Sequence, residues 1–262
     1  MSKPFVLIAT GNELVKGKKV NTNTSHIANV LNEHDLSVAA HIICRDDSDQ
    51  LIEFINTCIK DNHVIITGGL GPTDDDITRE AVAEVSLKPL QYSSEISHVV
   101  ANYLATKQLT MHERHHKQCY FPEDSLIYRN DFGTACGFVC LYENNYIYVL
   151  PGPPTENQPM FNNMMNHIRE HNIVFKKHKL HWQVSAPEER IVAHINKIIK
   201  DHELELETCA HKSQACDVYL NLLSENCSIV AIKNLEQSIT QCWDEAGISY
   251  KSMHKLIGDI ND

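Results

Sequence analysis

One stretch of the chain combines clustered glycines with consecutive carboxylates. A short apolar run at residues 64–67, rich in β-branched side chains, precedes Gly68, Gly69 and Gly71, and residues 74–76 are all aspartates. Glycines let the backbone turn sharply and approach a ligand, and a strand, a glycine turn and a helix N-terminus together present free N–H groups to a phosphate. Because three carboxylates repel a phosphate unless a cation lies between them, these residues predict a site for a phosphate together with a metal ion.

A plainer interpretation of the same residues is a tight turn with solvated acids ahead of a capped helix. Asp76 and Thr78 are both residue types that cap helices, and we expect one of them to cap a helix over residues 79–85. Solvated acids, however, need no preceding glycine cluster, and the whole pattern is far more constrained than a single glycine motif. The residues therefore favour the phosphate and metal site.

The elements around this stretch alternate between strands and helices. Apolar runs at residues 5–9, 38–44 and 64–67 predict buried strands, and helices are expected from residues 21–24 to about residue 34 and over residues 51–59. This order predicts an α/β domain with a parallel sheet, in which ligands bind outside the carboxyl ends of the strands. The loops after the three strands would bring together Glu13, Asp46, Asp47 and residues 68–76.

The chain is expected to divide at about residue 170. The first domain, residues 1–170, is completed by two helices and three short strands, at 93–118 and 160–168 and at 126–128, 138–142 and 146–150. An Asn144-Asn145 turn joins the last two strands. Residues 171–262 predict a small α+β domain, with strands at 180–184, 204–207 and 218–223 and helices at 187–199 and 235–243.

The composition excludes several classes of protein. The 262 residues carry a formal net charge of −11, which argues against a general nucleic-acid binder because such a protein needs a basic surface. The chain opens without a signal sequence and has no apolar run long enough for a membrane span, so we expect a cytoplasmic protein without a membrane partner. Its nine cysteines have no framework spacing and are expected as reduced core thiols.

Residues 112–116 match the H-E-x-x-H pattern of zinc proteases. That mechanism needs both histidines on one helical face and a third ligand. The surroundings are polar, no third ligand is indicated by spacing, and a chain with 16 histidines makes chance matches easy. A solvated helix end near the substrate is therefore expected here in place of a zinc site.

The motifs over residues 5–165 resemble, in their order and density, the N-terminal part of the CinA family of competence- and damage-inducible proteins. Residues 68–81 are close to the family signature Gly-Gly-Leu-Gly-Pro-Thr-x-Asp-Asp-x-Thr-Arg-Glu-Ala. Further matches follow in order at Thr10-Gly11-Asn12-Glu13-Leu14, Thr22-Asn23, Asp46-Asp47, Lys117-Gln118, Gly133-Thr134-Ala135 and Leu150-Pro151-Gly152. The resemblance implies a MoaB/MogA-like three-layer domain with a mostly parallel sheet. It also implies a small KH-like domain, which lacks the Gly-x-x-Gly clamp of RNA-binding members and is expected to be structural or to form a homodimer.

The chain departs from the family pattern at several positions. Asn12 and Asn21 stand where the family usually has aspartates, which removes two potential metal ligands, and Cys136 replaces a proline. The C-terminal deamidase domain of longer members is not found in the sequence, so nicotinamide-mononucleotide deamidation is not expected.

The resemblance implies hydrolysis of a nucleotide pyrophosphate such as ADP-ribose to AMP and ribose-5-phosphate, with K⁺ and a divalent ion (Co²⁺, Mg²⁺ or Mn²⁺) as cofactors. Asp46 and Glu13 would orient the attacking water or add metal ligands, and Lys117 would pair with a phosphate oxygen. The expected site comprises the metal ligands Glu13, Asp75 and Asp76, the catalytic residues Asp46, Asp76 and Lys117, and the substrate-binding residues Asn23, Gly68, Gly69, Gly71, Thr73, Thr134 and Gly152.

Two other functions fit the same fold. A molybdopterin-binding protein or a molybdopterin adenylyltransferase would use the aspartates of the two corresponding loops equally well, because fold alone does not settle function. A non-catalytic scaffold is the third interpretation, and Asn12 and Asn21 are the residues that favour it.

Overall fold

The computed structural model describes residues 3–171, 177–201, 205–210, 216–223 and 229–253. The chain forms two compact units, Met1–Val174 and Phe175–Asp262. The first unit carries the predicted glycine and aspartate stretch.

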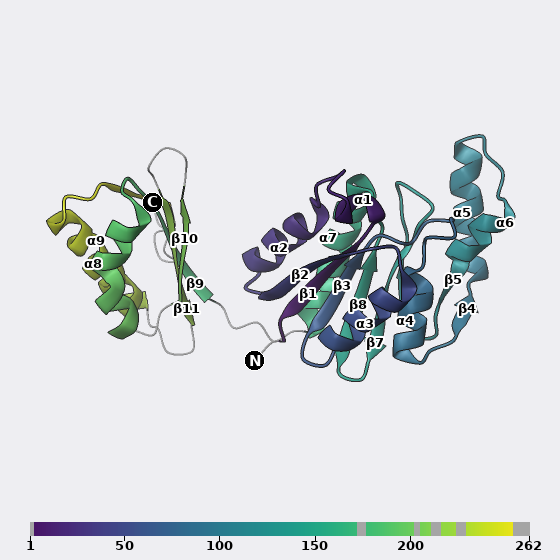
Figure 1. The fold of residues 1–262 in the computed structure, drawn as a ribbon, viewed down its shortest axis with the longest axis horizontal. Coiled ribbons are helices and arrows are strands. Elements are labelled where there is room, and N and C mark those ends of the chain that lie inside the picture. The colour runs from purple at the N-terminus through teal and green to yellow at the C-terminus, as the bar shows by residue number, and fades with distance from the viewer. Residues whose placement is uncertain (1–2, 172–176, 202–204, 211–215, 224–228, 254–262) are drawn as a thin grey trace. The chain divides into compact units, whose positions relative to one another are not determined.

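A six-stranded sheet is the centre of the first unit (Figure 1). Its strand order is β2-β1-β3-β8-β7-β6. The first four strands run parallel, and β7 pairs antiparallel with both β8 and β6. The expected α/β fold with a mostly parallel sheet is therefore confirmed. The strands span Phe5–Thr10 (β1), Val38–Cys44 (β2), His63–Thr67 (β3), Leu126–Tyr128 (β6), Gly137–Tyr142 (β7) and Asn145–Leu150 (β8).

Helices cover both faces of this sheet, which gives three layers. In β1 every residue is buried, with Phe5 and Leu7 in one core cluster and Val6 and Ile8 in the other. Successive side chains of a strand point to opposite faces, so such a run must be covered on both sides. The first cluster includes residues of α2 (Asn23–Glu33) and α7 (Pro154–His171), and the second includes residues of α3 (Ser48–Cys58) and α4 (Thr78–Ser86).

The predicted single helix over residues 93–118 is wrong. Residues 94–106 form α5 (Ser94–Thr106), after which Gln108 adopts a left-handed φ of 57° and the Leu109 N–H donates to the Leu104 carbonyl at 2.9 Å, so the helix ends. The chain continues through α6 (Glu113–His116) and the 3₁₀ turn η1 (Lys117–Cys119). An unpredicted two-stranded sheet of β4 (Leu90–Tyr92) and β5 (Tyr120–Pro122) flanks these helices (Figure 1).

Smaller corrections concern element ends. The β7–β8 turn lies one residue earlier than expected, because Asn145 already pairs with Tyr142 and Glu143 takes the left-handed conformation, with a φ of 49°. Residues 10–14 are expected as a loop after the first strand, but residues 12–14 lie in the helical turn α1 (Asn12–Val15). Helix α7 is longer than the predicted 160–168 at both ends.

The described residues of the second unit form an antiparallel sheet with the order β10-β11-β9-β12 and two helices, α8 (Glu188–Asp201) and α9 (Ile229–Glu245). Its core contains Trp182 and Trp243, whose fully buried rings meet edge to face at 5.4 Å. The assignment of this unit as KH-like stays a prediction. The strands span Lys177–Val184 (β9), Glu205–Ala210 (β10), Cys216–Leu223 (β11) and Tyr250–Ser252 (β12).

Two other sequence expectations concern cysteines and membranes. The cysteines whose side chains are described carry free thiols, and most of them are buried. Within the described residues, no helix combines the length and the hydropathy that crossing a bilayer demands.

Candidate active site

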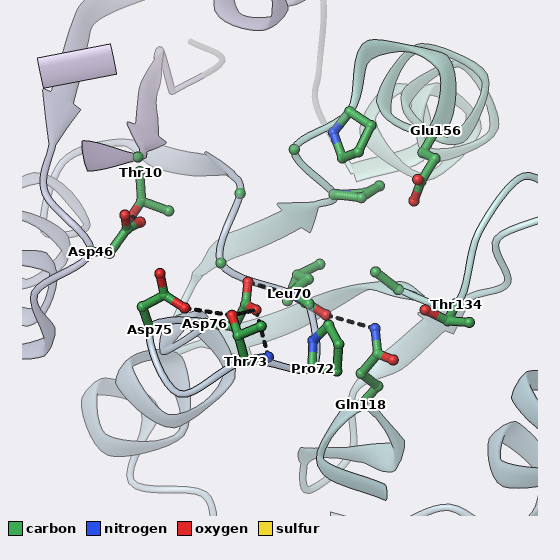
Figure 2. A pocket seen from close by; sticks show the side chains of 18 of the residues that line it. Thr10, Asp46, Leu70, Pro72, Thr73, Asp75, Asp76, Gln118, Thr134 and Glu156 are labelled. Carbon is green, nitrogen blue, oxygen red and sulfur yellow. Dashed lines mark hydrogen bonds between the residues drawn. The ribbon is translucent and has the colours of Figure 1, made fainter. Parts of the chain in front are cut away.

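A cleft of about 360 Å³ lies at the carboxyl ends of β1, β3 and β8 (Figure 2). We call it the loop cleft. It brings together most of the residues predicted for the site, although they come from loops far apart in the sequence. Its lining includes Thr10, Glu13, Asp46, Gly68, Gly69, Gly71, Thr73, Asp75, Asp76, Thr134 and Gly152.

The first two glycines let the loop after β3 pack closely against its neighbours. Gly68 has a φ of 104°, and a Cβ atom there would lie 2.6 Å from the carbonyl oxygen of Thr10. Gly69 has a φ of 68°, and a Cβ atom there would lie 2.1 Å from the hydroxyl oxygen of Thr78. Both positions therefore need glycine for conformation and for space.

The Asp76 side chain stabilises the glycine loop by binding two of its backbone N–H groups. Its carboxylate accepts hydrogen bonds from the N–H groups of Gly71 at 2.8 Å and Thr73 at 2.9 Å. These two N–H groups are among the donors expected to bind a phosphate, and in this structure they donate to the Asp76 side chain instead. The expectation that Asp76 or Thr78 caps α4 is wrong, because the residue at the N-cap is Ile77 and no side chain caps this helix.

Thr78 instead ties the start of α4 to the same loop. Its hydroxyl donates to the carbonyl of Gly68 at 2.9 Å, and its backbone N–H donates to the carbonyl of Gly69 at 3.2 Å. The helix start is thus fixed to the glycine loop by two hydrogen bonds.

Two carboxylates converge on a single hydroxyl in the loop cleft. The Thr73 hydroxyl lies 2.6 Å from an Asp76 oxygen and also within hydrogen-bond distance of Asp75 (Figure 2). This hydroxyl has one proton to donate to two carboxylates. The hydrogen bond from Thr73 lowers the pKa of the exposed Asp75 carboxyl below that of an ordinary aspartate.

Asp46 is fixed at the end of β1. One carboxylate oxygen accepts from the Thr10 hydroxyl and the other from the Asn12 backbone N–H, both at 2.8 Å. Since the second contact is made by the backbone, the presence of asparagine at position 12 in place of aspartate leaves it intact. Asp46 therefore presents a pre-oriented carboxylate to the cleft.

Two cationic side chains bind the loop carbonyls. Arg79 is 1% exposed and donates to the Leu70 carbonyl at 2.7 Å, and burial lowers its pKa to about 10, so it remains charged at neutral pH. Lys117 donates to the Thr73 carbonyl at 3.1 Å and lies 3.6 Å from Glu80. Lys117, predicted to contact a phosphate, is not among the lining residues of the loop cleft and instead supports the loop.

Gln118 and Glu156 also line the loop cleft, although neither was predicted as a site residue. Gln118 is fully buried and donates to the Leu70 carbonyl at 3.2 Å. Glu156 accepts from Asn130 at 2.6 Å, and its partial burial raises the pKa of its carboxyl. Glu156 follows the proline-rich loop after β8, so the rule that ligands bind at strand ends indicates this loop but does not single out Glu156 within it.

The charge of the loop cleft is strongly negative. Its described lining contains no lysine or arginine, and its carboxylates are Glu13, Asp46, Asp75, Asp76 and Glu156. No group of three or more His, Cys, Asp or Glu side chains among the described residues forms a complete metal site. The paired acids at positions 75 and 76 do fit an ion such as Mg²⁺, which is usually held by one or two carboxylates together with waters and substrate phosphates.

Asn23 lies outside the loop cleft, in a second pocket of about 400 Å³ that we call the side pocket. Its side-chain amide donates to the Gly152 carbonyl at 2.7 Å. The two cavities share Thr10, Glu13, Gly152 and Pro153 as lining residues. They therefore lie side by side.

The H-E-x-x-H stretch does not form a protease-like zinc site. Helix α6 begins at Glu113, so His112 precedes the helix, and the His115 ring accepts from the His112 backbone N–H at 2.9 Å. His112 and His116, the two histidines of the pattern, are thus not presented on one helical face.

Known proteins with similar sequences match part of this chain. A relative from Clostridium tetani that carries the name competence-damage inducible protein is 33% identical over 74% of this chain and 48% of its own length. A relative of the same name from Listeria monocytogenes is 38% identical over 61% of this chain and 39% of its own length. The match thus spans less than half the length of these curated relatives.

A solved structure and a family model also match part of this chain. The crystal structure of CinA from Thermoplasma acidophilum, described as a protein with unknown function, has a TM-score of 0.59 and 28% identity, over 64% of this chain and 98% of its own. Residues 6–171 match the family described as "Probable molybdopterin binding domain". This chain, which is similar to CinA proteins, belongs to the molybdopterin-binding domain family.

Proposed function

We propose that this chain hydrolyses the diphosphate bond of a nucleotide pyrophosphate, with ADP-ribose as the expected substrate. One observation carries the proposal: a glycine loop and carboxylates line a cleft at strand ends without a lysine or arginine among the described lining residues. An anionic diphosphate in such a cleft requires a cation. Asp75 and Asp76 would hold a divalent ion there, with Glu13 as a further ligand, and K⁺ remains an expectation from the resemblance.

The proposed reaction uses residues whose positions are fixed. When bound, the divalent ion would neutralise charge on the leaving phosphate and lower the pKa of water. Asp46 accepts a hydrogen bond from the attacking water and orients it. The water oxygen bonds to one phosphorus, the bond from that phosphorus to the bridging oxygen breaks, and the released protons pass to solvent. The products are AMP and ribose-5-phosphate.

Product analysis tests this proposal. EDTA-treated protein is incubated with ADP-ribose, K⁺ and Co²⁺, Mg²⁺ or Mn²⁺, and the products are separated by anion-exchange chromatography. We expect AMP and ribose-5-phosphate in equal amounts. The Asp46→Asn variant is expected to lose roughly 10²- to 10⁴-fold in rate, whereas Asp74→Asn, which changes an exposed acid outside the cleft lining, keeps its rate. Intact ADP-ribose with every metal contradicts the proposal.

A pterin-binding protein or an adenylyltransferase is the second candidate, and the match to a molybdopterin-binding family favours it. Fluorescence titration with a pterin, and assay for transfer of AMP to it, distinguish this function from hydrolysis. A non-catalytic scaffold predicts neither activity, and under that function Asp76→Asn leaves every measurable activity unchanged.

A further inference from the structure

We propose that the side pocket binds the flat, amine-bearing heterocycle at one end of the substrate, and that the side-chain carbonyl oxygen of Asn23 accepts a hydrogen bond from that amine. The inference rests on the proposed function, because it assumes that a diphosphate occupies the loop cleft. Since the two cavities share Thr10, Glu13, Gly152 and Pro153, a ligand anchored in the loop cleft extends directly into the side pocket.

The Asn23 side chain has an unused acceptor. It is 8% exposed, and its carbonyl oxygen is buried without a hydrogen-bond partner among the described residues. Buried polar atoms without partners are rare in folded proteins because each costs stability. The amide nitrogen is already bound to the Gly152 carbonyl at 2.7 Å, which fixes the orientation of the group. We therefore assign the Asn23 carbonyl oxygen as the acceptor of a hydrogen bond from a ligand.

The walls of the side pocket indicate the kind of donor. Leu14, Val20, Pro153 and Pro154 give it a largely apolar lining, in contrast to the acidic loop cleft. Apolar walls with a few placed polar groups are typical of pockets for flat organic ligands. A heterocycle with an exocyclic amine supplies both the apolar faces and the N–H donor. Adenine and pterin share this chemistry.

The loop cleft has a comparable acceptor in a different setting. Gln118 is fully buried, donates to the Leu70 carbonyl and leaves its own carbonyl oxygen without a partner among the described residues. It lies among the glycine loop and carboxylates, where phosphate and metal-bound water are expected. The apolar setting of Asn23 therefore distinguishes the side pocket as the heterocycle site.

Matched ligands test the role of the amine. Calorimetry with Mg²⁺ compares ADP with purine riboside 5′-diphosphate, which lacks the 6-amino group, and compares pterin with lumazine in the presence of pyrophosphate. We expect the amine-bearing member of one pair to bind roughly tenfold more tightly, as the loss of a partner for a buried acceptor predicts. The pair that discriminates identifies adenine or pterin as the ligand. In Asn23→Ser this preference disappears.

A second variant tests the pocket without touching the Asn23 contacts. Val20 is 84% exposed and lines the side pocket, so Val20→Trp is expected to fold, to obstruct the pocket and to weaken the discriminating ligand at least about tenfold. Val15→Trp is the control, because Val15 is 43% exposed and does not line the pocket. Pyrophosphate with Mg²⁺ should bind equally to both variants.

The outcomes separate this inference from the proposed function. If neither ligand pair discriminates, or if Val20→Trp binds the heterocycle as tightly as Val15→Trp does, the side pocket is not the heterocycle site, even when pyrophosphate binds and ADP-ribose is cleaved. If pyrophosphate with Mg²⁺ does not bind and ADP-ribose stays intact, the proposed function itself fails.

Discussion

At the scale of single residues, Asp75 and Asp76 of the loop cleft have different structural roles. Asp76 satisfies the backbone N–H groups of Gly71 and Thr73, whereas the exposed Asp75 accepts a hydrogen bond from the neighbouring Thr73 hydroxyl and from its own backbone. Asp76 is thus part of the architecture of the loop as well as a proposed metal ligand. Asp75 has no comparable role in holding the loop and is proposed only as a metal ligand.

This difference predicts unequal effects on stability. Asp76→Ala leaves two loop N–H groups without their acceptor and is expected to lower the free energy of unfolding by about 1 kcal/mol or more. Asp75→Ala removes an exposed side chain and is expected to change it by less than about 0.5 kcal/mol. Urea denaturation measures both. Equal destabilisation by the two substitutions would show that Asp76 does not organise the loop.

Glu156 gives a prediction about pH. Its folded-state pKa is raised by burial, so the folded protein keeps this proton to a higher pH than the unfolded chain does. Stability therefore falls as the pH rises from the ordinary carboxyl pKa through the raised one. Glu156→Gln lacks this proton equilibrium and should gain stability relative to the wild type across that window.

Urea denaturation at several pH values measures the difference in unfolding free energy between Glu156→Gln and the wild type. Because Gln keeps an oxygen that accepts from Asn130, the comparison isolates the charge. A difference that is constant with pH would contradict the assignment of a raised pKa to Glu156.

At the scale of elements, the glycine loop is locked between β1 and α4. A side chain at Gly69 would meet the Thr78 hydroxyl at 2.1 Å, whereas a side chain at Gly17, with a similar φ of 66°, would meet nothing within 4 Å. Any L-residue would suffer similar backbone strain at the two positions, and only at Gly69 would it also clash with a neighbour.

Gly69→Ala is therefore expected to be more destabilising than Gly17→Ala. Gly17→Ala, the control, is expected to lower the free energy of unfolding by about 1 kcal/mol, because it places an L-residue at positive φ. Gly69→Ala also displaces α4, so its total loss is expected to be roughly 2–4 kcal/mol. Thermal or urea unfolding of both variants gives the comparison. A similar loss in the two variants would mean that the loop is free to move away from Thr78.

The sequence predicts the elements that carry a strong periodic signal. Residues 38–44 are β2 as expected, and α3 begins after Asp47, whose side chain accepts from the Gln50 N–H. The end of α5 was not predicted, because it depends on a left-handed Gln108 and carries no glycine or proline signal. The three-residue strands β4 and β5 are too short for a periodic pattern.

The candidate site is predictable to a similar extent. The strand-end rule gathers Glu13, Asp46 and the glycine loop, because chain order and parallel pairing determine which loops meet. How the loops fold back in three dimensions determines the contacts of Asp76. It also determines that Gln118 and Glu156 line the loop cleft. No spacing rule in one sequence encodes those contacts.

At the scale of the whole molecule, both tryptophans of the chain, Trp182 and Trp243, lie in the second unit, and the loop cleft lies in the first. Tryptophan fluorescence therefore reports the unfolding of the second unit, and enzymatic activity or ligand binding reports the first. The proposed site is built entirely from residues of the first unit.

We therefore expect ligands to stabilise only one of two unfolding transitions. ADP with Mg²⁺ at 100 times its Kd should raise the unfolding free energy of the first unit by about 2.7 kcal/mol. The tryptophan transition in urea should stay unchanged, while the loss of ADP binding moves to higher urea. Equal shifts of both transitions would show that the two units unfold together.

The central claim is that a diphosphate binds in the loop cleft only together with a divalent cation. Calorimetric titration of EDTA-treated protein with ADP, with and without Mg²⁺, tests it most directly, with an Asp75→Asn, Asp76→Asn double variant as the control for binding of Mg²⁺ to ADP in solution. We expect Mg²⁺ to raise the affinity of the wild type for ADP at least about tenfold and to leave the affinity of the variant unchanged. Equally tight binding of ADP without the metal would contradict it.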